Sequence, residues 1–145
     1  MIALASDHGA YALKEKIKTH LLEYGQLVSD FGSHSAESCD YADFAAPAAI
    51  AVAEGRCLHG IVLCTTGIGA SIAANKIRGI RCALCTDPFM AEMTRRHNDA
   101  NMLALGAGIT GDLMSLRIVD IWLNTPFDGG RHQQRIDKIT ALERV

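Results

Sequence analysis

Residues 60–76, GIVLCTTGIGASIAANK, join a short apolar run, a glycine-rich turn and a run of small residues. The apolar residues 60–64 predict a buried strand, and residues 65–69 predict a tight loop. A short helix is expected from about Ala70 to Lys76. A strand, a glycine loop and a helix in this order are typical of a right-handed crossover unit. The stretch therefore predicts one strand of a parallel sheet.

The same alternation continues on both sides of this stretch. Further strands are expected at residues 1–6, 27–31, 80–86 and 102–105, and helices at 11–24, within 44–54, at 88–97, at 111–123 and from about 132 to 143. Pro47 should lie in the first turn of its helix, because an interior proline costs about 3 kcal/mol. The pattern predicts one α/β domain over residues 1–145, Rossmann-like and doubly wound, with a five-stranded parallel sheet of order 2-1-3-4-5 flanked by helices, and a C-terminal helix from about His132.

Composition excludes several classes of protein. The 145 residues are 49% hydrophobic and 21% charged, as in a globular domain, and the high apolar share indicates a subunit interface. A net charge of −2 gives no case for nucleic acid or an anionic membrane. The longest apolar run, residues 45–53, is too short to span a bilayer, and no basic segment precedes the apolar start. Five cysteines without framework spacing indicate reduced thiols, so we expect a cytoplasmic protein.

Two polar corners follow the first and third predicted strands. In doubly wound sheets, ligands bind beyond the carboxyl ends of the strands, where the strand order reverses. With the expected order, that point lies between these two strands, which end in Asp7-His8-Gly9 and in residues 64–69. Gly67 and Gly69 let backbone N–H groups turn inward, and the positive end of the next helix favours an anion there and the thiolate form of Cys64.

Counting residues separates this loop from better-known phosphate motifs. A dinucleotide fingerprint would need glycine at Ile72, and the Gly-Lys-Ser/Thr of a Walker loop is absent. A cysteine phosphatase loop would need arginine at Ala70. The loop thus looks like an oxyanion site rather than a nucleotide or phosphotransfer site. A glycine turn with no function beyond joining strand to helix remains the alternative.

Two later segments carry polar side chains that need an explanation. His97-Asn98-Asp99-Ala100-Asn101 lies between a helix end and a strand, where His97 and Asn98 are either helix C-caps or functional groups. Arg131 and Arg135, spaced i and i+4, open the last helix on one face. The helix dipole disfavours cations at that end, whereas arginine forks there suit a phosphate.

Other candidates are better explained by structure. Cys82 and Cys85 would face opposite sides of a strand, so no metal site is expected from their C-x-x-C spacing. Lys14, Lys16 and Lys18 are interpreted as a solvated helix face.

Taken in order, the motifs resemble a known family. These motifs are Asp7-His8-Gly9, Asp40-Tyr41, residues 64–69 with 71–76, Gly79-Ile80-Arg81, residues 97–101 and Gly129-Gly130-Arg131-His132. Together they resemble the type B ribose-5-phosphate isomerases, a superfamily that includes the galactose-6-phosphate isomerase subunits. The resemblance covers essentially the whole chain. It implies an aldose–ketose isomerase without cofactor or metal, acting on a small sugar phosphate as a homodimer or homotetramer, with active sites at the dimer interface.

The resemblance also implies roles for individual residues. Cys64 would be the base that moves a proton between C1 and C2, and Thr66 with the N–H groups of Gly67, Ile68, Gly69 and Ala70 would hold the enediolate oxygen. Asp7 and His97 would assist ring opening, with His97 and Asn98 coming from the neighbouring subunit. The remaining substrate contacts would be Tyr41 on the sugar and His8, Arg131 and Arg135 on the phosphate.

Two departures from the family pattern leave the substrate open. The family usually has glycine where Thr65 stands, and a basic residue where Gly108 stands. Interconversion of ribose 5-phosphate and ribulose 5-phosphate is expected. The alternatives are an isomerase of allose 6-phosphate, galactose 6-phosphate or a tetrulose phosphate, and a non-catalytic phosphosugar-binding subunit. A thiol redox or phosphotransfer protein built on Cys64 would lack a resolving cysteine and an arginine at position 70.

Overall fold

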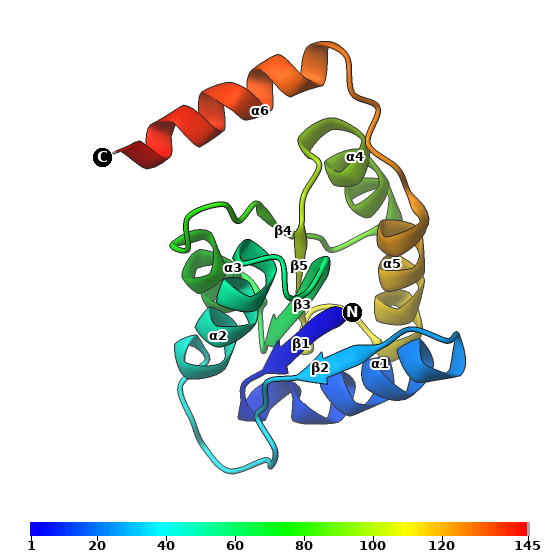
Figure 1. The fold of residues 1–145 in the computed structure, drawn as a ribbon. Coiled ribbons are helices and arrows are strands. Elements are labelled where there is room, and N and C mark those ends of the chain that lie inside the picture. The colour runs from blue at the N-terminus through cyan, green and yellow to red at the C-terminus, as the bar shows by residue number, and fades with distance from the viewer. Residues whose placement is uncertain (145) are drawn as a thin grey trace.

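The computed structural model describes residues 1–144 and shows one sheet between two layers of helices (Figure 1). All strand pairs are parallel, in the order β2-β1-β3-β5-β4. The strands are β1 (Ile2–Ser6), β2 (Val28–Asp30), β3 (His59–Cys64), β4 (Cys82–Leu84) and β5 (Met102–Gly106). The predicted α/β class, Rossmann-like layers and five parallel strands are confirmed.

The expected order of the last two strands, 2-1-3-4-5, is wrong. β5 lies beside β3, and β4 forms the edge. Burial explains the exchange: all five residues of β5 are buried, whereas the three residues of β4 are half-buried. An inner parallel strand is covered on both faces and is accordingly apolar throughout. The reversal point between β1 and β3 is unaffected.

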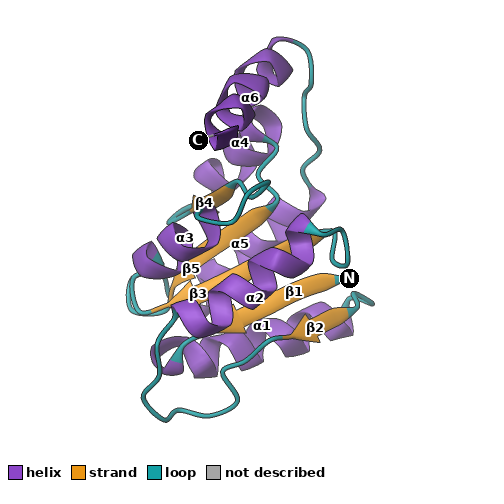
Figure 2. Ribbon diagram, turned by 60° about the vertical axis from the view of Figure 1, so that its left-hand side comes forward, coloured by secondary structure: helices purple, strands orange, loops and turns teal. Residues whose placement is uncertain are grey.

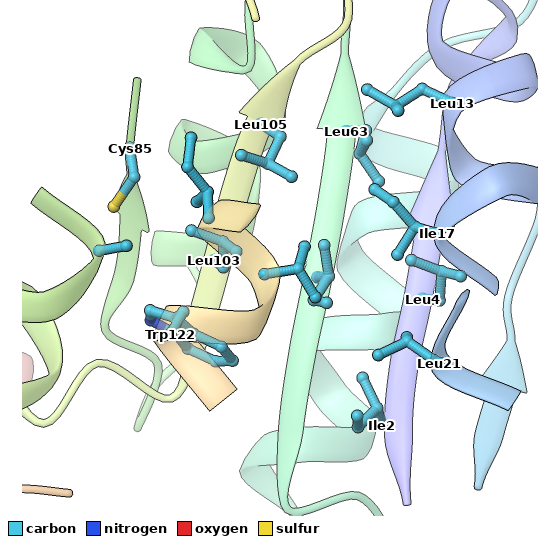
Figure 3. Packing of buried hydrophobic residues seen from close by; sticks show 14 of the residues in the cluster. Ile2, Leu4, Leu13, Ile17, Leu21, Leu63, Cys85, Leu103, Leu105 and Trp122 are labelled. Carbon is cyan, nitrogen blue, oxygen red and sulfur yellow. The ribbon is translucent and has the colours of Figure 1, made fainter. Parts of the chain in front are cut away.

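Helices cover both faces of the sheet (Figure 2). They are α1 (Tyr11–Glu23), α2 (Ala42–Ala53), α3 (Ile68–Asn75), α4 (Pro88–Asn98) and α5 (Asp112–Asn124), with a 3-10 turn at His8–Ala10. The last helix, α6 (Arg131–Ala141), lies beside α4 and away from the sheet, and a 3-10 turn at Leu142–Arg144 follows it (Figure 1). One core joins α1, α4 and α5 to the sheet around Leu13, Ile17 and Trp122 (Figure 3). The other joins α2 and α3 to the opposite face. None of the helices described in residues 1–144 is long and apolar enough to cross a membrane.

Pro47 lies inside α2, not in its first turn as expected. The helix begins at Ala42, so Pro47 is its sixth residue and cannot donate to the carbonyl four residues earlier. Packing compensates, because the small side chains of Ala45, Ala48 and Ala49 on this helix are buried against the sheet. Close helix–sheet contact thus outweighs the missing hydrogen bond.

Lys14 is buried, contrary to the expected solvated face. Its side chain is 0% exposed, and Nζ donates to both carboxylate oxygens of Asp30 at 2.8 and 2.9 Å. Asp30 also accepts from Lys18 and from the N–H of Gly32. Burial alone would raise the pKa of Asp30, but the hydrogen bonds from Lys14, Gly32 and Lys18 lower it. This ion pair ties α1 to the end of β2.

Replacement of Lys14 by methionine should therefore destabilise the fold by about 3 kcal/mol at pH 7, since it leaves a largely buried carboxylate less well paired. Because the folded-state pKa of Asp30 is lowered, its contribution is present above the unfolded pKa of about 3.9 and is lost as pH falls through the folded value. The deficit should thus shrink in acid. Urea unfolding at pH 7 and pH 3 measures both effects.

Lys16→Met is the matched control, because Lys16 on the same helix pairs with Asp112 at the surface. Such exposed pairs contribute about 1 kcal/mol or less. Equal losses in the two variants at pH 7 would contradict the assigned role of Lys14.

Candidate functional site

The carboxyl ends of β1 and β3 meet at the corner where the sequence predicts a ligand. The N–H of Asp7 donates to the carbonyl of Leu63 at 3.2 Å, which joins the two strand ends. The Asp7 side chain is 7% exposed and accepts from the N–H of Gly9 at 3.0 Å, capping the 3-10 turn. A buried carboxylate therefore stands beside the loop that follows β3.

Cys64 ends β3 as a buried thiol, 5% exposed. The chain turns at Gly67, whose φ of +78° is in the left-handed region, and the N–H of Gly67 donates to Cys64 Sγ at 3.1 Å. This turn lets α3 begin at Ile68, two residues before the expected start. The N–H of Ile68 donates to Thr66 Oγ1 at 3.2 Å. The loop thus directs one N–H at the cysteine sulfur and a second at the Thr66 hydroxyl.

The first turn of α3 supplies the remaining donors. An α-helix leaves its first N–H groups without helical acceptors. Here Gly67 and Ile68 use theirs on Cys64 and Thr66, while the N–H groups of Gly69, which is half-buried, and Ala70, which is buried, have no acceptor among the described residues. Two N–H groups at the positive end of a helix form a site for an oxyanion.

The loops after β3 and β5 pack against each other without spare room. A Cβ at Gly67 would lie 2.5 Å from Leu84 Cδ1 and 2.8 Å from the backbone of Leu105, and one at Gly106 would lie 2.5 Å from the carbonyl of Thr66. Gly106 was not singled out as a site residue from the sequence. The available signal was its place at the end of an apolar strand, but the contact depends on β5 lying beside β3.

A cavity of about 440 Å³ opens at this corner. Tyr41 forms one wall, and a Cβ on Gly69 would lie 2.5 Å from its ring. His8 lies on the adjacent 3-10 turn, where Nδ1 accepts from the N–H of Cys39 at 3.1 Å. The lining residues are Asp7, Tyr41, Cys64, Thr65, Thr66, Ile68, Gly69 and Ile72. The lining is neutral apart from Asp7, so it offers an anion no cationic side chain.

A second cluster gathers His97, His132 and two arginines. The rings of His97 and His132 stack with centroids 4.3 Å apart, which joins the end of α4 to the start of α6. His132 is buried, and burial together with the charges of His97, Arg131 and Arg135 lowers its pKa, so the ring stays neutral at pH 7. The side chains of Arg131 and Arg135 are exposed. The two exposed guanidinium groups beside this histidine pair suit an anionic ligand.

His97 and Asn98 do not cap α4. The capping residue is Asp99, which adopts a left-handed conformation with φ of 44°. The carbonyl of Asn98 accepts from Arg81 Nε at 2.9 Å. Capping therefore does not account for the polar side chains of His97 and Asn98.

The same cluster includes a group that could bind a cation. Ligand atoms of His97, Asp128 and His132 lie within 4.8 Å of one another. However, Arg96 Nε already donates to both carboxylate oxygens of Asp128 at 3.2 Å. Arg131 and Arg135 add positive charge near His132. The electrostatics of the cluster thus favour an anion over a metal ion.

Within one chain, the two clusters lie at opposite ends of the sheet (Figure 1). Cys64 pairs with Gly106 at the carboxyl end of β5, whereas His97 and Asn98 precede Met102 at its amino end. Five residues of strand separate these ends by about 16 Å. The structure therefore brings Asp7, His8, Tyr41, Cys64 and Thr66 together, and separately His97, Asn98, Arg131 and Arg135.

Comparisons with known proteins give the class of the protein. The sequence profile described as Ribose/Galactose Isomerase matches residues 2–139, so the chain belongs to that family. Ribose-5-phosphate isomerase B of Escherichia coli is 47% identical over 99% of this chain and 96% of the relative. The structure of ribose-5-phosphate isomerase B from Clostridium thermocellum superposes with a TM-score of 0.98 at 52% identity, covering 99% of this chain and 97% of the other.

A further solved structure contains a sugar phosphate. Ribose-5-phosphate isomerase B from Mycoplasma genitalium with bound ribulose-5-phosphate has a TM-score of 0.96 and 39% identity, over 99% of this chain and 95% of the other. The present protein is thus an aldose–ketose isomerase of the ribose-5-phosphate isomerase B type, and its substrate class is sugar phosphates.

Cys82 and Cys85 pack on opposite faces of the sheet, as expected. Burial raises the pKa of each thiol to about 12. Since iodoacetamide reacts with thiolates, both cysteines should react at pH 8 about a thousandfold more slowly than an ordinary thiol. Peptide mapping by mass spectrometry over time measures these rates. The urea-unfolded protein is the control, and equal rates in folded and unfolded protein would contradict the prediction.

Proposed function

We propose that the protein interconverts ribose 5-phosphate and ribulose 5-phosphate through an enediolate, with Cys64 as the base. The observation that carries this proposal is the placement of Cys64 Sγ beside the free N–H groups at the start of α3. A proton transfer between C1 and C2 needs a base at one face of the two carbons and donors at the oxygen that becomes negative. Cys64 and the N–H groups of Gly69 and Ala70 supply these.

The surroundings of Cys64 Sγ support its role as the base. The N–H of Gly67 donates to Sγ at 3.1 Å. The positive end of α3 adds a favourable field. Ring opening removes the proton of the C1 hydroxyl and adds a proton to the ring oxygen. In the proposed mechanism, Asp7, buried at the same corner, and His97 assist these two proton transfers.

A phosphate group is best bound by cationic side chains, and the residues that line the cavity at Cys64 include none. Arg131 and Arg135 are exposed on α6, about one sheet length away, so we propose that a second copy of the chain brings them, with His97 and Asn98, to the cavity. Two exposed apolar side chains of the cavity lining, Ile68 and Ile72 on α3, support burial by a neighbouring subunit. The proposed active unit is a homodimer, alone or within a homotetramer.

The base is tested with Cys64→Ala. A positioned base contributes about 10²–10⁴-fold, so kcat should fall by that factor while circular dichroism and oligomeric state stay unchanged. Cys57→Ala, another buried cysteine, is the matched control and should retain activity. Iodoacetamide should inactivate the wild type through Cys64, and saturating substrate should protect it. Activity of Cys64→Ala within about tenfold of the wild type would refute the assignment.

The shared site is tested by complementation. Cys64→Ala and His97→Ala proteins, each inactive, are mixed under conditions that exchange subunits. Heterodimers would then contain one site with both groups intact, so activity should return toward a quarter to a half of the wild-type value, depending on the heterodimer fraction. Native mass spectrometry establishes that heterodimers form. If they form and the mixture stays inactive, the two residues do not act in one shared site.

The phosphate site is tested with Arg131→Ala and Arg135→Ala. Loss of a charge-assisted hydrogen bond costs about 2 kcal/mol, so KM for ribose 5-phosphate should rise about 30-fold. KM for unphosphorylated ribose should stay the same. Arg56→Ala, which removes an exposed arginine paired with Glu54, is the control. Unchanged KM values in both variants would show that α6 does not bind the phosphate.

A further inference from the structure

Thr65 occupies a central position that the proposed chemistry does not use. It follows β3, the middle strand of the sheet, and its exposed side chain lines the cavity beside Cys64 and Thr66. Because β1 and β5 flank β3, the segments that follow those two strands lie on either side of Thr65.

Both flanking segments have a glycine against this side chain. A Cβ at Gly9, after β1, would lie 2.5 Å from Thr65 Oγ1. A Cβ at Gly108, after β5, would lie 3.0 Å from Thr65 Cγ2 and 3.1 Å from the Thr65 carbonyl oxygen. The two branches of one threonine thus fill the space above two glycines.

Glycine is required at positions 9 and 108 because a Cβ there would collide with Thr65, and not because the backbone conformation demands it. Neither Gly9 nor Gly108 has a φ in the left-handed region, unlike Gly67. Other residues could adopt the same backbone, but their Cβ atoms would meet Thr65. The β-branched side chain therefore fits a slot bounded by the ends of three adjacent strands, and it forms a fixed wall of the cavity.

We propose that Thr65 is a specificity-determining residue that limits the length of the sugar phosphate by its shape. This inference rests on the proposed function, since it concerns the same cavity. With the slot filled, the cavity accepts a five-carbon sugar phosphate better than its six-carbon homologue. One methylene in a closely fitted pocket changes kcat/KM by about 10–200-fold, which is within reach of a single side chain.

The test compares ribose 5-phosphate with allose 6-phosphate, its six-carbon homologue, in wild type, Thr65→Ala and Thr65→Val. Alanine empties the slot, so the ratio of kcat/KM for the six-carbon to the five-carbon substrate should rise about tenfold. Valine keeps the branched shape and removes only the hydroxyl, so its ratio should stay within about threefold of the wild type. This pattern would show that shape sets the selectivity.

Three results would overturn the inference. These are a wild type that prefers the six-carbon substrate, an unchanged ratio in Thr65→Ala, and a shift in Thr65→Val as large as in Thr65→Ala. If the enzyme is active on ribose 5-phosphate and gives any of these three results, the role of Thr65 is refuted and the proposed function still stands. A correctly folded wild type that isomerises neither substrate refutes the proposed function, and the inference with it.

The contact itself is tested with Gly9→Ala. Its new methyl group would lie 2.5 Å from Thr65 Oγ1, whereas the next nearest atoms, Asp7 Oδ1 at 3.4 Å and Thr65 Cβ at 3.8 Å, are at ordinary contact distances. Gly9→Ala should lower both the melting temperature and kcat/KM, and Gly9→Ala with Thr65→Ala should regain the values of Thr65→Ala alone. Equal effects of Gly9→Ala with and without Thr65 would show that the two residues are not coupled.

Discussion

The contact between the loop after β3 and the end of β5 is the constraint on which the site depends. A Cβ at Gly67 would meet the backbone of Leu105, and a Cβ at Gly106 would meet the backbone of Thr66. This contact fixes the turn at Gly67, which directs one N–H to Cys64 Sγ and starts α3 at Ile68. The start of α3 in turn decides which N–H groups remain free. The positions of the proposed base and of the proposed oxyanion donors thus follow from one close backbone approach.

The length of the sheet keeps two clusters of polar side chains apart within one chain. Ligands of parallel sheets bind at the carboxyl ends of the strands, and Asp7, Cys64 and Tyr41 gather there. The stacked histidines and the exposed arginines of α6 gather at the other end, where the guanidinium groups suit a phosphate. In the proposed mechanism, the first cluster supplies the proton chemistry and the second supplies charge from a neighbouring chain.

Much of the fold could be predicted from the sequence because apolar runs and glycine turns are local signals. The strands, the helices and the polar corner at Asp7 and Cys64 were predicted on that basis. The order of the last two strands was not predicted correctly, since the strand after a crossover from β3 can lie either next to β3 or one place further out in the sheet. The contact of Thr65 with Gly108 depends on this order, because Gly108 follows β5. The contact of Thr65 with Gly9 depends on β1 lying beside β3, which was predicted, but the distance between the two residues is not a sequence signal. Lys14 was misassigned for a related reason. Lys14 and Lys18 are four residues apart, share one helix face and both bond Asp30, whereas Lys16, two residues from each, points to Asp112 at the surface.

The central claim is that the N–H groups of Gly69 and Ala70 hold the oxygen that becomes negative while Cys64 moves the proton. Amide NMR of the protein titrated with a phosphorylated hydroxamate, whose planar anion resembles an enediolate, tests it most directly. The account predicts large downfield proton shifts at Gly69 and Ala70, because a hydrogen bond to an anion deshields the donor proton. Binding of the hydroxamate without shifts at these two amides would contradict the account.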